Sequence, residues 1–262
     1  MFQTFDETND PSHGASRVAS LRTWLDEAGL DGFLVPRADE HQGEYVPACA
    51  ERLKWLTGFT GSAGVVLVLK EQAVLFVDGR YTLQARHQVD PEVFAIENLI
   101  GNPPPEWLME NVPAGTRIGL DPWLHTISEV AALRKAGVEV VPVDTNPIDV
   151  LWADRPQPPL GKVEIQPLAF AGELAKDKLA RLAEDIKAAG GSHAVLTDPS
   201  SLAWAFNIRG SDVPHTPLAL GFAVLAAEGP HRVYLDERKL GIETRAYLTQ
   251  LAHLKSPSEL ES

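Results

Sequence analysis

The chain repeats one order of helix and strand signals in its two halves, which restricts it to a duplicated α/β design. In the first half, apolar residues recur at helical spacing, a glycine stops the helix, and a buried strand follows: Val18, Leu21, Leu25, Ala28, Gly29 and Phe33–Val35. The second half repeats this series at an offset of 161 residues: Leu179, Leu182, Ile186, Ala189, Gly190 and Ala194–Leu196. Each half therefore predicts one α/β module.

The repetition continues downstream with a smaller offset. Leu53, Trp55, Gly61 and Ser62 correspond to Leu202, Trp204, Gly210 and Ser211 at an offset of 149 residues, and Val77-Asp78 corresponds to Leu235-Asp236 at 158. The fall from 161 to 149 means that the first copy carries 12 extra residues after its opening strand. This insertion holds His41, Glu44, Tyr45 and Cys49.

The bulk composition is that of a soluble globular protein with two domains. Hydrophobic residues make up 44% and charged residues 23% of the 262 positions. With 23 basic against 36 acidic residues the net charge is −13, so we expect no nucleic-acid partner. The chain lacks a signal-peptide pattern and a membrane-length apolar run, and its single cysteine, Cys49, suits a reducing compartment. We therefore expect a cytoplasmic protein with no membrane partner.

Proline and glycine positions set the expected boundaries. The sequence predicts a flexible lead-in over 1–16, a first domain over 17–145 and a second domain over 168–262. Between them it predicts a proline-rich connector over 146–167 without helix or central strand. Trp152, inside the connector, is expected to pack between the domains. A helix is expected from Gly241 to Leu254, and nothing after it matches Ile118–Val143 of the first copy. The second domain is therefore expected to be truncated.

Three glycines between a tryptophan and a strand, Gly58, Gly61 and Gly64, suggest a phosphate-binding loop, but the pattern of such loops is missing. No Gly-Lys-Ser/Thr follows, and no G-x-G-x-x-G opens a helix. The glycines are therefore predicted to serve tight turns and close packing.

The candidate site residues are few, and each has a structural interpretation beside the functional one. His41 and Glu44 lie three apart in the insertion; they are either surface-loop residues or binding residues, and two ligands are too few for a zinc site. Arg80, in Asp78-Gly79-Arg80-Tyr81, follows a buried strand and either belongs to an ordinary turn or binds a peptide carbonyl or carboxylate. No catalytic residue and no metal ligand set is predicted within the chain.

Four motifs occur in an order that resembles a known family. They are PRADEHQGEY at 36–45, GFTGSAG at 58–64, DGRY at 78–81 and NIRGSD at 207–212. Together they resemble the amino-terminal part of a three-domain Xaa-Pro aminopeptidase (aminopeptidase P), and the similarity covers the chain from about Arg17 onward. The resemblance implies an α/β fold of two tandem creatinase N-terminal-like (ribonuclease H-like) domains, each a mixed β-sheet flanked by helices.

The resemblance also implies where the chemistry lies. In that family a carboxy-terminal domain, absent from this chain, holds a dinuclear metal site of Mn or Zn. This chain is expected to be inactive alone. Its expected role is to shape the active-site cleft and to restrict the substrate to peptides with proline second. Its expected partner is the catalytic domain of the same protein. The residues expected to face the substrate are Arg80, His41 and Glu44. Two others, Arg209 and Asp212, are expected to brace the second domain. The full-length parent protein is expected to be a homodimer.

Two alternatives stay open. The two modules could form a stand-alone binding or regulatory protein on the same scaffold, which a reading frame ending at Ser262 would favour. Creatinase and prolidase enzymes share related amino-terminal domains and act on other substrates. The duplication weighs against these relatives, because they usually have one such domain.

Overall fold

The computed structural model describes residues 10–261, and these form two compact units. The first contains the residues up to Asp39 and Ala48–Pro156; the second contains Glu40–Pro47 and the residues from Gln157. The sequence assigned the segment 40–47 to the first domain, whereas the structure groups it with the second unit. Residues 1–9 of the expected lead-in lie outside the described residues, and helix already begins within 11–16.

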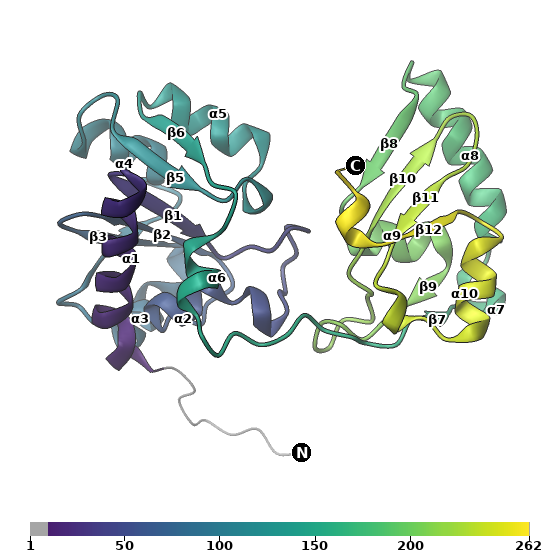
Figure 1. Cartoon of the computed structure of the whole chain (residues 1–262), viewed down its shortest axis with the longest axis horizontal. Helices are drawn as coiled ribbons and strands as arrows, with labels where there is room; N and C mark the ends of the chain where they lie inside the picture. The colour runs from purple at the N-terminus through teal and green to yellow at the C-terminus, as the bar shows by residue number, and fades with distance from the viewer. Residues whose placement is uncertain (1–9, 262) are drawn as a thin grey trace. The chain divides into compact units, whose positions relative to one another are not determined.

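A six-stranded mixed sheet in the order β4-β3-β2-β1-β5-β6 forms the centre of the first unit (Figure 1). Only β2 runs antiparallel to its neighbours; the pairs β3–β4, β1–β5 and β5–β6 are parallel. The strands are β1 (Gly32–Pro36), β2 (Gly64–Leu69), β3 (Ala73–Val77), β4 (Phe94–Asn98), β5 (Arg117–Leu120) and β6 (Glu139–Pro142).

Helices cover both faces of this sheet because successive strand residues point to opposite faces. Phe33 and Val35 pack in one core with the first three helices and the sixth, while Leu34 packs in a second core with the fourth and fifth. The helices are α1 (Gly14–Ala28), α2 (Arg52–Thr57), α3 (Thr82–Gln88), α4 (Pro104–Asn111), α5 (Ile127–Lys135) and α6 (Pro147–Leu151). One-turn 3₁₀ helices accompany them: η1 (Pro11–His13), η2 (Ala48–Ala50), η3 (Gly79–Tyr81) and η4 (Pro122–Leu124).

The glycines after α2 have the turn and packing roles that the sequence predicts. Gly58 ends α2 in the left-handed region at φ +83°, which L-residues with a Cβ rarely adopt. A Cβ on Gly61 would lie 2.2 Å from the ring of Phe59. Both positions therefore need glycine for the backbone path.

The second unit repeats the first with fewer strands. Its main sheet has the mixed order β12-β11-β10-β8, and a small antiparallel pair joins β7 to β9. The strands are β7 (Glu164–Ile165), β8 (His193–Leu196), β9 (Ile208–Arg209), β10 (Phe222–Ala226), β11 (Arg232–Tyr234) and β12 (His253–Lys255). The helices are α7 (Leu168–Ala171), α8 (Ala175–Ala188), α9 (Pro199–Phe206), η5 (Glu237–Lys239), α10 (Ile242–Thr249) and η6 (Pro257–Glu259).

The strand orders of the two sheets confirm the duplication and the predicted α/β class. In the first unit, β1 pairs antiparallel with β2, β2 pairs antiparallel with β3, and β3 pairs parallel with β4. In the second unit, β8, β10, β11 and β12 pair in the same order and with the same directions. Residues 10–261 hold no counterpart of β5 and β6 beside β8. β8 is therefore an edge strand of its sheet, and its Val195 side chain is 59% exposed.

Two sequence expectations about elements were wrong. The helix expected over 241–254 ends at Thr249, and β12 follows it. The connector was expected to exclude helix, yet Asn146 caps α6 by accepting a hydrogen bond from the Ile148 amide at 2.9 Å. Pro147 fits there because the first helical position needs no amide donor.

Trp152 is buried, as its size suggests, but it belongs to the first unit's own core. Its ring stacks on Trp55 with centroids 5.7 Å apart and planes at 20°. This packing arises because α6 folds the start of the connector back onto α1 and α2.

No helix within residues 10–261 has both the length and the apolar character that crossing a membrane requires.

Candidate functional site

Arg80 and the start of the insertion both follow strands that end at the same edge of the first sheet. Because β1, β3, β4, β5 and β6 run in the same direction, their carboxyl ends lie at the same edge. The insertion follows β1 at this edge, and Arg80 follows β3. Open α/β sheets place ligand crevices outside the carboxyl ends of their strands. The first unit thus directs Arg80 to the edge where ligands are usually bound.

Local hydrogen bonds fix the backbone at Arg80. Asp78 caps η3 by accepting from the Arg80 amide at 2.8 Å, and its carboxylate also accepts from Arg80 Nε at 3.0 Å. These hydrogen bonds lower the pKa of Asp78, and the one from the Arg80 side chain has the largest effect. The Arg80 side chain is 64% exposed and lies over the Tyr81 ring, 5.3 Å from its centroid. Tyr81 in turn pairs with the Ser62 hydroxyl at 2.8 Å.

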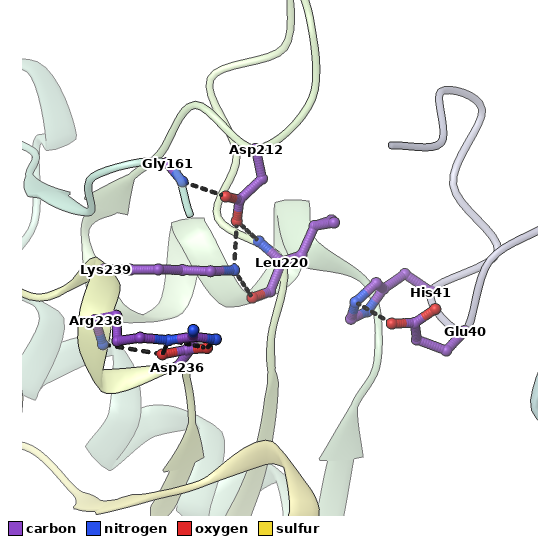
Figure 2. Close-up of polar contacts among 8 residues, drawn as sticks. All are labelled: Glu40, His41, Gly161, Asp212, Leu220, Asp236, Arg238 and Lys239. Carbon is purple, nitrogen blue, oxygen red and sulfur yellow. Dashed lines mark hydrogen bonds and ion pairs between the residues drawn. The ribbon is translucent and has the colours of Figure 1, made fainter. Parts of the chain in front are cut away.

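The second unit contains the same aspartate–arginine arrangement. Asp236 caps η5 by accepting from the Arg238 amide at 2.9 Å, and Arg238 Nε donates to Asp236 at 3.0 Å (Figure 2). The side-chain and backbone hydrogen bonds of Arg238 lower the pKa of Asp236 to about 2. The ion pair is therefore a feature of the repeat, and the contact between Ser62 and Tyr81 distinguishes the surroundings of Arg80.

His41 is a buried anchor of the insertion on the second unit. Its Nδ1 donates to the Thr197 carbonyl oxygen at 2.9 Å, just after β8. Its ring stacks on Phe222 of β10 with centroids 4.6 Å apart, and the side chain is 2% exposed. Nε2 lies 3.8 Å from Glu40 Oε1 (Figure 2). The imidazole is thus held on two sides by the second unit.

Glu44 lies three residues after His41 on the exposed part of the same segment. The residues that the sequence grouped as substrate-facing divide between the units: Arg80 belongs to the first, and His41 and Glu44 belong to the second. Sequence spacing places His41 beside Glu44, and the fold gives His41 its partners Thr197 and Phe222 in the second unit.

Buried cations brace the second unit, and sequence reasoning missed them. Lys239 Nζ contacts Asp212 Oδ2 at 2.8 Å, and Asp212 also accepts from the backbone amides of Gly161 and Leu220 (Figure 2). The Asp212 side chain is fully buried, so the predicted bracing role of Asp212 matches its contacts. Lys178 Nζ donates to Asn207 at 2.7 Å beneath Trp204.

The described residues do not supply a dinuclear metal site. Within 10–261 no group of three or more histidine, cysteine, aspartate or glutamate side chains is placed to hold a metal ion. A dinuclear site needs more carboxylate and imidazole ligands than any part of this range brings together. No catalytic step through a metal can be assigned to these residues.

Residues 17–151, just over half of the chain, match the creatinase/prolidase N-terminal domain family. The chain belongs to this family. Residues 154–262 match a second description of the creatinase/prolidase N-terminal domain, so both halves carry the same kind of module. The family and the mixed sheets confirm the fold class that the motifs implied.

Relatives with the same two-module arrangement are named as aminopeptidases. A probable Xaa-Pro aminopeptidase P of Ajellomyces capsulatus is 34% identical over 95% of this chain, and one of Aspergillus clavatus is 35% identical over 90%. An X-prolyl aminopeptidase of Caenorhabditis elegans, a cytosolic enzyme with a di-nuclear active site, superposes with a TM-score of 0.88 at 29% identity over 95% of this chain. The chain spans 42%, 37% and 43% of the lengths of these relatives.

Proposed function

We propose that this chain is the non-catalytic amino-terminal part of a metallo-aminopeptidase that removes the first residue from peptides with proline second. In this proposal the chain shapes the cleft and restricts the substrate, and a further domain of the same protein supplies the dinuclear metal centre.

The observation that carries the proposal is the likeness to the Caenorhabditis elegans aminopeptidase, which extends over 95% of this chain but only 43% of the enzyme. More than half of that enzyme is therefore outside the match. Since the described residues bring no metal-binding group together, the hydrolytic centre is assigned to the unmatched part.

Arg80 is the residue proposed to contact the peptide. Its guanidinium is exposed at the carboxyl edge of the first sheet, where a planar fork of donors can bind a carbonyl or carboxylate oxygen. Pairing with Asp78 restrains the side chain before substrate arrives. The Arg80 side chain then loses less conformational entropy when the substrate binds.

His41 and Glu44 are proposed to act together through the insertion. His41 has its Nδ1 on Thr197 and its ring on Phe222, so it positions the segment. Glu44 is exposed on that segment and is the group able to meet a polar or cationic part of a peptide. The peptide-facing role thus falls on Glu44, with His41 as its positioning residue.

Two further properties of the whole protein are proposed, its compartment and its oligomeric state. The Caenorhabditis elegans enzyme is cytosolic, and we propose the same compartment here. We also propose that the intact protein is a homodimer, which light scattering on the full-length product would measure directly.

An activity assay of the purified chain tests whether the catalytic centre lies outside it. Supplied with Mn²⁺ or Zn²⁺ and a peptide with proline second, it should release no amino acid, because the described residues bring no metal-binding group together. Metal-dependent release, with contaminating peptidase excluded, would overturn the proposal. A natural reading frame that stops at Ser262 would instead favour a stand-alone binding module.

A further inference from the structure

A pocket of about 340 Å³ opens in the first unit between the sheet and the pair α4 and α5. Leu34 and Pro36 at the carboxyl end of β1 and Leu99 just after β4 contribute to it. Its volume lies within the range of small-molecule sites, roughly 300 to 1,000 Å³. The pocket thus combines a suitable size with the strand edge where α/β sheets bind ligands.

The walls of the pocket are apolar and nearly free of hydrogen-bond donors. Besides the aliphatic residues of the sheet, Pro103, Pro104 and Pro105 form one wall at the start of α4. Proline has no amide hydrogen, so this helix start presents few donors. Flat proline rings and aliphatic side chains suit a planar apolar ligand. Two carboxylates, those of Glu106 and Glu129, line the pocket, and its lining residues include no lysine or arginine.

His125 is among the residues that line the pocket, and it carries a buried polar atom. Its side chain is 5% exposed, and Nε2 is buried without a hydrogen-bond partner among residues 10–261. Nδ1 lies 3.9 Å from Glu129 Oε2. Burial lowers the pKa of His125 against the opposing effects of Glu129 and Asp121, which favours the neutral ring.

The position of Glu129 selects one tautomer of that neutral ring. A carboxylate near Nδ1 favours the tautomer with the proton on Nδ1, and Nε2 is then an acceptor. A buried acceptor without a donor costs free energy that a ligand's donor can recover.

We propose that this pocket binds a planar aromatic group that carries one hydrogen-bond donor, of the phenol or indole class, with the donor directed at His125 Nε2. The apolar walls hold the ring, and the single unpartnered acceptor selects the donor. The carboxylates of Glu106 and Glu129 disfavour an acidic substituent on the same ring. The group can belong to a free small molecule or to a tyrosine or tryptophan side chain. The site does not depend on the proposed peptidase function.

Titration of the full chain with phenol, indole and toluene, followed by heteronuclear NMR or calorimetry, tests the proposal. Phenol and indole should bind roughly threefold to tenfold more tightly than toluene, the gain from one neutral hydrogen bond. N-acetyltyrosine amide distinguishes the source: affinity equal to or above that of phenol indicates a side chain, and exclusion indicates a free molecule. Equal affinities for phenol and toluene would overturn the proposal.

Two variants locate the binding. Ala132 lines the pocket from the exposed part of α5, so Ala132→Phe should fill it and remove binding. Ala131→Phe, the same change one residue earlier on α5 and outside the lining, is the matched control and should bind normally. His125→Phe should erase the preference for phenol over toluene. Should that variant fail to fold, the Ala132 and Ala131 pair still decides: undiminished binding in Ala132→Phe contradicts the site.

Discussion

His41 Nδ1 donates to the backbone carbonyl of Thr197 at 2.9 Å, across 156 residues of sequence. Residues 40–47 of the insertion are therefore held within the second unit, with Phe222 stacked on the same imidazole. This contact ties the candidate residue Glu44 to the second module, although the sequence places it in the first.

Replacing His41 by alanine should destabilise the second unit. The change removes a buried hydrogen bond and an aromatic contact, for which we expect a loss of about 1 to 3 kcal/mol in the free energy of unfolding. Urea denaturation measures it, and hydrogen exchange should show the amides of residues 40–47 losing protection. Glu44→Ala, on the exposed part of the same segment, is the control and should change stability by less than about 0.5 kcal/mol. Equal effects of the two variants would contradict the anchoring role.

Arg80→Ala in the full-length protein should weaken turnover of peptides with proline second and leave the fold intact. Loss of one charge-assisted hydrogen bond to the substrate predicts a cost of about 1.5 to 3 kcal/mol, or roughly tenfold to a hundredfold in kcat/KM.

Arg238→Ala is the matched control for Arg80→Ala, because Arg238 makes the same pairing with its own aspartate in the second repeat. Its kinetics should equal those of the unchanged protein. Kinetics of Arg80→Ala that match this control would leave Arg80 as a turn residue only.

The buried pair of Lys239 and Asp212 should be essential to the second unit. Lys239→Met leaves the carboxylate of Asp212 buried without its cation, and breaking such a pair costs about 3 to 5 kcal/mol. The exposed pair of Arg245 and Glu237 gives the comparison: Arg245→Met should cost between 0 and about 1 kcal/mol. Thermal and urea denaturation of both variants measure the difference. A Lys239→Met protein as stable as Arg245→Met would show that the pair is dispensable.

The contribution of Asp236 to stability should be lost in strong acid. Its pKa is lowered from 3.8 to about 2 by the hydrogen bonds of Arg238, so the folded state favours the ionised carboxyl more than the unfolded state does. The contribution is full above pH 3.8 and is lost as the pH falls through about 2. Asp236→Asn should remove this part of the pH dependence of unfolding. An Asp236 carboxyl that titrates near 3.8 by NMR would refute the assignment.

The duplication was predictable because apolar spacing in helices and strands is a local property. The α1–β1 and α8–β8 pairs lie where the offset of 161 residues places them. The parallel outer strands β4 and β12 escaped prediction, because β4 mixes apolar and polar residues without alternation and β12 has only three residues. Proline at 147 suggested a break in structure, whereas proline suits a first helical position.

The candidate site was predictable only in part. The strand-to-turn position of Arg80 follows from local pattern, because a buried strand and an Asp-Gly pair are adjacent in sequence. Thr197 and Phe222, which hold His41, are more than 150 residues away from it in sequence, and no local signal indicates which module a loop packs against. His125 gave no sequence signal either, since its isolation depends on the pocket around it.

The most direct test of the central claim is the intact mass of the natural gene product, measured together with its Xaa-Pro peptidase activity with and without a chelator. A product of roughly twice this length or more, as the relatives suggest, with activity lost on chelation, is the predicted result. A product that ends near Ser262 and has no such activity would contradict it and would leave the two modules as a binding protein.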